Sequence, residues 1–183
     1  MDEGVLRIQP KFAIALRAGL TTGVVLAIAE LAFGIALYFL RPAMSDFIDS
    51  GGQDAVVMLP LITSWVAFLF LVLAVYFACG MIAAKGLSPL PLQSRDIAAL
   101  GAIAGAVAEL VRSVVAITVD FVLSYLWPLA GVRSADVLST ALTSAGIRLV
   151  CGLPAFVILA AAVAGFSAYL FSTIFFRPET PPK

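Results

Sequence analysis

Four long apolar stretches, separated by short polar segments, dominate the sequence. They cover residues 12–40, 56–84, 97–127 and 141–176. Each is longer than the roughly 20 residues that an α-helix needs to cross a hydrocarbon core about 30 Å thick. The pattern therefore predicts an all-α, polytopic membrane protein, with four transmembrane helices in an up-down-up-down bundle that forms one domain over residues 1–183.

Prolines mark several of the expected helix boundaries. Arg41-Pro42 is expected to close the first helix, so that residues 43–55 form a loop, and residues 129–140 are expected to form a second loop. A kink is expected at Pro154, inside the fourth stretch, because proline lacks the N–H group that an α-helix uses.

Composition supports a membrane location and narrows the possible functions. Hydrophobic residues make up 62% of the chain and charged residues 12%, against roughly 45–50% and about 25% in soluble domains. The net charge is zero, so no clustered basic face indicates nucleic-acid binding. There is no histidine, which excludes histidine-ligated haem or metal and histidine proton relays. Cys79 and Cys151 are expected in opposite leaflets, too far apart for a disulfide.

The distribution of basic residues predicts the orientation. Seven lie before or just inside the start of the first stretch, between the second and third, or after the fourth: Arg7, Lys11, Arg17, Lys85, Arg95, Arg177 and Lys183. The opposite side has only Arg41 and Arg133. Because basic flanks stay in the cytoplasm, both termini are predicted to be cytoplasmic in a multi-pass protein of the cell membrane. The proline-rich residues 177–183 are expected to form a flexible tail.

A short sequence recurs in the first and third stretches. AIAEL at residues 27–31 returns as AVAEL at residues 106–110, which places Glu30 and Glu109 at matching positions. A G-x-x-x-G motif, which lets two helices approach closely, precedes each glutamate: Gly19 with Gly23, and Gly101 with Gly105. The pattern is typical of two tandem helical-hairpin repeats, and chance similarity between alanine-rich helices is the alternative.

Five charged residues lie deep within the apolar stretches, and we call them the polar seam: Glu30, Glu109, Arg112, Asp120 and Arg148. A charge at the centre of a membrane helix costs about 2.5–3.5 kcal/mol on insertion scales, so these side chains are expected to face protein or water. The three in the third stretch fall within about 160° of a helical wheel, together with the two glycines of that stretch. They are expected to form one stripe.

Position along the helices predicts how the polar seam pairs. Glu30 and Glu109 lie at similar depth, and Arg112 can bond Glu109 at i, i+3 or reach Glu30 on the first helix. Asp120 and Arg148 both lie toward the other end and form the natural pair. Three acids against two arginines would leave Glu30 or Glu109 without a full cationic partner, so a shared or bound proton is expected there.

These observations leave two classes of function open. The leading expectation is a non-catalytic integral membrane protein, a structural or accessory component that self-associates or belongs to a larger membrane complex in the lipid bilayer. The alternative is a small proton- or cation-coupled transporter or channel that uses Glu30 and Glu109. An enzyme acting on a lipid-soluble substrate is disfavoured, because no nucleophile stands out and two glutamates supply too few ligands for a metal. We therefore expect no catalytic, cofactor-binding or metal site.

Overall fold

Every element that the structure describes is a helix. The structure is a computed structural model that describes residues 10–49, 55–126 and 137–175. Its elements are α1 (Pro10–Asp49), α2 (Ala55–Leu87), α3 (Ser94–Leu126), α4 (Val137–Ile147), the π-helical turn η1 (Arg148–Gly152) and α5 (Leu153–Phe175). Four helical stretches, in α1, α2, α3 and α4 through α5, are long and apolar enough to cross a membrane. The predicted all-α, four-helix architecture is confirmed, and the chain is a multi-pass membrane protein.

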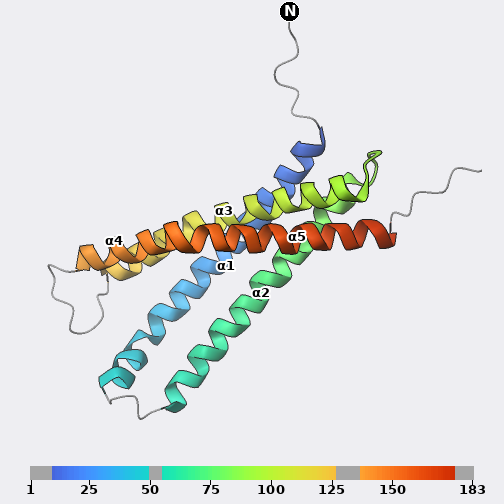
Figure 1. Cartoon of the computed structure of the whole chain (residues 1–183). Helices are drawn as coiled ribbons and strands as arrows, with labels where there is room; N and C mark the ends of the chain where they lie inside the picture. The colour runs from blue at the N-terminus through green and yellow to red at the C-terminus, as the bar shows by residue number, and fades with distance from the viewer. Residues whose placement is uncertain (1–9, 50–54, 127–136, 176–183) are drawn as a thin grey trace, which may run out of the picture.

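The four spans form two helical hairpins that cross each other obliquely (Figure 1). The first hairpin consists of α1 and α2, and the second consists of α3 and the continuous run of α4, η1 and α5. The start of α1, the connection between α2 and α3, and the end of α5 lie at one end of the molecule, which we call the terminal end. The end of α1 with the start of α2, and the end of α3 with the start of α4, lie at the opposite end, which we call the tip end. The central helix is α3, which packs along α1 and α5 and also contacts α2 and α4.

Small residues allow α3 to approach its neighbours closely. Gly101 and Gly105 pack against a row of alanines on α5, and Gly19 and Gly23 of α1 pack against α3. A Cβ atom at Gly19 would lie 2.6 Å from the carbonyl oxygen of Ala104, which is closer than side chains come to a backbone. Both G-x-x-x-G motifs therefore lie at contacts between helices of the same chain.

Two predicted loops are shorter in the structure. The sequence predicts the first loop from residue 43, but α1 continues through Pro42 to Asp49. The apolar span ends at Leu40, so Pro42, which has no N–H group to donate to the helix, lies just beyond that span. The second loop is predicted to extend to residue 140, but α4 begins at Val137, because Val137 and Leu138 lengthen the apolar run. Residues 127–136 and the predicted tail at 177–183 lie outside the described residues.

The interruption expected at Pro154 takes the form of a π-helical turn just before it. In η1 the N–H group of Leu153 donates to the carbonyl oxygen of Arg148, five residues back, instead of four. Pro154 has no N–H group to restore the α-helical pattern at the next step. Such a turn adds about one residue to the helical path and often lies at a functional position. Here its first residue is Arg148 of the polar seam.

Gly105→Ala is expected to destabilise the bundle by about 1–3 kcal/mol, because the new methyl group would press on the Ala160 carbonyl group and the Ala164 side chain. Gly146→Ala is the matched control, since no atom lies within 4 Å of a Cβ built there and alanine favours a helix by about 0.5–1 kcal/mol. Unfolding in detergent micelles, followed by circular dichroism, measures both. Equal stability of the two variants would contradict the close packing of α3 on α5.

Candidate functional site

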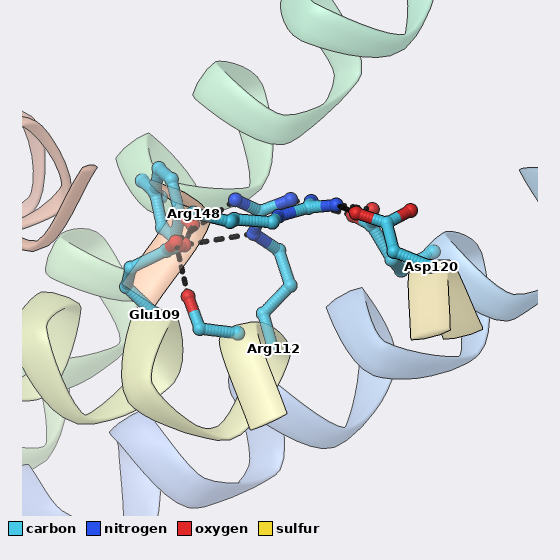
Figure 2. Close-up of polar contacts among 7 residues, drawn as sticks. Glu109, Arg112, Asp120 and Arg148 are labelled. Carbon is cyan, nitrogen blue, oxygen red and sulfur yellow. Dashed lines mark hydrogen bonds and ion pairs between the residues drawn. The ribbon is translucent and has the colours of Figure 1, made fainter. Parts of the chain in front are cut away.

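The five residues of the polar seam come together in one cluster. Glu30 lies on α1, three members lie on α3, and Arg148 is the first residue of η1. Figure 2 shows both arginine side chains extending between Glu109 on one side and Asp120 on the other. The cluster therefore connects the two hairpins.

Arg112 is the centre of the cluster because it binds two carboxylates at once. Its Nε and Nη2 atoms donate to the two oxygens of Glu109, at 2.7 and 2.8 Å, and its Nη1 atom donates to Glu30 Oε2 at 2.5 Å. The planar guanidinium matches the two oxygens of a carboxylate, which makes such paired bonds strong. All three side chains are buried, so α1 and α3 are joined by ion pairs inside the bundle.

Glu109 accepts hydrogen bonds from two further side chains that the sequence analysis missed. The hydroxyl group of Tyr76 on α2 donates to Glu109 Oε2, and Ser113 Oγ donates to Oε1 at 2.8 Å. Tyr76 brings α2 into the cluster, so all four spans contribute to it. A signal was present in each case: Ser113 lies at i+4 from Glu109 on the same helix, and a tyrosine hydroxyl in mid-span needs a partner.

Arg148 contacts carboxylates on two different helices. Its Nη1 atom pairs with Asp120, as expected, but its Nη2 atom also donates to Glu30 Oε1 at 3.1 Å. Glu30 thus contacts both arginines, but Arg112 is shared with Glu109, and Arg148 is shared with Asp120. Summed over the cluster, three carboxylates against two guanidiniums still leave one formal negative charge.

Exposure of the polar seam rises toward the tip end. The exposed fraction of the side chain is 0% for Glu109, 26% for Arg148 and 41% for Asp120. On the terminal side of Glu109 the described interior is built mainly from alanines and other small apolar residues. The buried hydroxyl groups there, such as those of Ser167 and Ser172, donate to backbone carbonyl groups. Within the described residues, the cluster is thus approached from the tip end and closed toward the terminal end.

A cavity of ≈ 80 Å³ lies directly against the cluster. One wall is polar and consists of Glu30, Arg112, Arg148 and Tyr76. The remaining wall is aromatic and aliphatic: Trp65, Phe68, Leu69, Val72, Leu73, Phe156 and Leu159. The rings are held in place by their neighbours, since Phe33 stacks on Phe68 with the ring centroids 4.2 Å apart and meets Trp65 edge to face. The cavity therefore combines buried charges with a preformed aromatic surface.

Within the described ranges, no three histidine, cysteine, aspartate or glutamate side chains are grouped so that they could hold a metal ion. Cys79 and Cys151 are both free, the first buried and the second exposed. Comparison with protein-family models, with curated proteins and with solved structures finds no match. The function therefore has to be inferred from the chemistry of the cluster and its cavity.

Arg112→Gln is expected to lower the free energy of unfolding by about 3–5 kcal/mol, because it leaves buried carboxylates without their main cation. The control is Arg17→Gln, which removes an exposed arginine near the terminal end. The double variant Glu109→Gln/Arg112→Gln is expected to recover part of the loss, since both partners of the pair are removed together. Unfolding titrations in mixed micelles measure all four proteins. A loss no larger for Arg112→Gln than for Arg17→Gln would contradict the central role of Arg112.

Proposed function

We propose that the chain is a non-catalytic membrane protein that serves as a structural or accessory component, either self-associated or within a larger membrane complex. One observation carries this proposal: ion pairs of the polar seam join α1, α3 and η1 within the chain. A buried cluster of this kind is suited to fixing which helices pair and in which register. It is less suited to conducting an ion, because closely packed small residues close the terminal end.

The ion pairs would set the register of the two hairpins. Glu30 reaches both Arg112 and Arg148, and a shift of α1 by one helical turn would move it about 5.4 Å along the axis. Both ion pairs would then be lost, and the buried carboxylate of Glu30 would be left without a cationic partner. The glycine contacts would be lost in the same shift, so packing and charge favour the same alignment.

Association with other subunits would use surfaces other than the glycine motifs. Both motifs are occupied within the chain, so they are not available to a second copy. Large apolar side chains on the outer faces of α1 and α2, such as Phe39 and Phe70, are exposed. Lipid or another membrane protein would cover them.

We further propose that both termini are cytoplasmic, and that the matched Glu30 and Glu109 reflect two tandem hairpin repeats.

The particle mass tests this proposal. In lipid nanodiscs or mild detergent, the intact particle is expected to contain several copies of the chain or other membrane proteins. Glu30→Gln/Glu109→Gln is expected to change its size or yield, because hairpin register would be weakened, while Asp96→Asn at an exposed position of α3 leaves both unchanged. Native mass spectrometry gives the composition. If the wild-type particle is a homogeneous monomer, the proposal is contradicted.

A small proton- or cation-coupled transporter is the second candidate, and one observation favours it. Glu30 lines the cavity, and the cluster carries one formal negative charge with its most exposed members, Asp120 and Arg148, toward the tip end. A proton or monovalent cation could reach Glu30 from that side. Release at the terminal end would require the hairpins to move apart, because the described interior is closed there.

Flux in liposomes tests the second candidate. A transporter would show proton or cation flux that Glu30→Gln and Glu109→Gln each reduce at least tenfold while the protein still inserts and folds, because each removes a carboxylate from the path. Asp96→Asn serves as the control again. Flux of the wild-type protein no higher than that of empty liposomes would exclude this candidate without affecting the structural proposal.

A further inference from the structure

The cavity beside the polar seam is reached from the lipid-facing side of the molecule. Its walls include side chains of α2 and α5 that are also exposed on the outer surface, among them Trp65, Leu69 and Leu159. Glu30 and Arg112, at its polar wall, are more than nine-tenths buried. A ligand entering between α2 and α5 would therefore meet apolar and aromatic side chains first and the charges last. That order suits an amphipathic molecule with a compact polar head.

The charge of the cluster indicates the sign of that head. The five residues of the polar seam carry one formal negative charge in surroundings of low dielectric, where unbalanced charge is costly. An anionic head would raise the imbalance to two, and a neutral head would leave it unchanged. A head with one positive charge would cancel it.

The aromatic wall favours the same sign. Trp65, Phe68, Tyr76 and Phe156 line the cavity, and the faces of aromatic rings attract cations, most of all organic ammonium groups. One ring already does so within the chain, since the guanidinium carbon of Arg112 lies 5.5 Å from the centroid of Phe156.

We propose that this cavity binds a lipophilic monovalent cation, with an ammonium head against Glu30 and an apolar body along the exposed wall between α2 and α5. A volume of ≈ 80 Å³ has room for a small head, and the body extends beyond it. The site goes beyond the structural role proposed above, since a bundle can be held in register without binding any ligand.

One ion pair in the cluster can be exchanged for the ligand. The contact between Arg148 Nη2 and Glu30 is 3.1 Å, longer than the three bonds that Arg112 makes. Arg148 also has Asp120 as a partner, so it loses only one of two carboxylates if an ammonium group takes its place at Glu30. After this exchange three carboxylates face three cations: Glu109 with Arg112, Asp120 with Arg148, and Glu30 with the ligand.

Equilibrium dialysis of labelled benzyltrimethylammonium against the full chain in phosphatidylcholine nanodiscs tests the proposal, with empty nanodiscs subtracted. Saturable binding is expected, with one site per chain. It should weaken at least tenfold in Glu30→Gln and several-fold in Trp65→Leu, and remain unchanged in Asp96→Asn. Because Glu30→Gln could disturb folding, Leu159→Trp provides an independent variant that fills the cavity mouth and leaves the ion pairs intact. It should also abolish binding.

Competition by two probes of similar shape separates charge from shape. Neopentylbenzene replaces the ammonium nitrogen with carbon, and benzylsulfonate carries a negative head. Neither is expected to displace benzyltrimethylammonium. Displacement by neopentylbenzene would mean that the cavity recognises shape alone, and preferential binding of benzylsulfonate would assign it to an anionic amphiphile. Either result, or the absence of saturable binding, would overturn the proposal. The particle mass is measured separately, so failure here is distinguishable from failure of the structural role.

Discussion

The bidentate bond between Arg112 and Glu109 is the interaction on which the rest of the structure depends. Both groups are buried on the central helix α3, where neither could remain charged without the other. Within this pair, each group can still form further hydrogen bonds. Arg112 uses it to hold Glu30 of the first hairpin, and Glu109 uses it to accept the hydroxyl group of Tyr76. A local i, i+3 pair thereby becomes the junction of all four spans.

Packing and polarity divide the bundle into two halves. Toward the terminal end, alanines and glycines bring helix backbones into contact, and the interior is close-packed. Toward the tip end, the hairpins cross and diverge (Figure 1). There the packing includes larger aromatic side chains, and a cavity lies beside the charges. The cluster lies at the border, where one half supplies rigidity and the other supplies access.

Much of this architecture follows from the sequence because charges in apolar stretches are so restricted. Glu30, Arg112 and Arg148 stand out by their cost in lipid, and the number of acids and arginines limits how they pair. Tyr76 was missed because its hydroxyl group signals the need for a partner, but the sequence does not show which group on another helix that partner is. The cavity depends on the crossing of the two hairpins, which no local pattern encodes. The end of α1 was misplaced because a proline at the end of an apolar stretch was taken as the end of the helix, whereas α1 continues through Pro42 to Asp49.

The π-helical turn has a consequence for geometry that neither α4 nor α5 reveals alone. Arg148 and Ala160 are separated by twelve residues, which in an unbroken α-helix would place them about 120° apart around the axis. A turn that absorbs about one residue reduces the separation to about 20°. Ala160, which packs on Gly105, and Arg148, which binds Asp120 and Glu30, can then both face the same neighbouring helix. The extra residue in η1 thus rotates Arg148 around the helix axis relative to Ala160. A regular helix of the same composition could turn either Ala160 or the guanidinium of Arg148 toward α3, but not both.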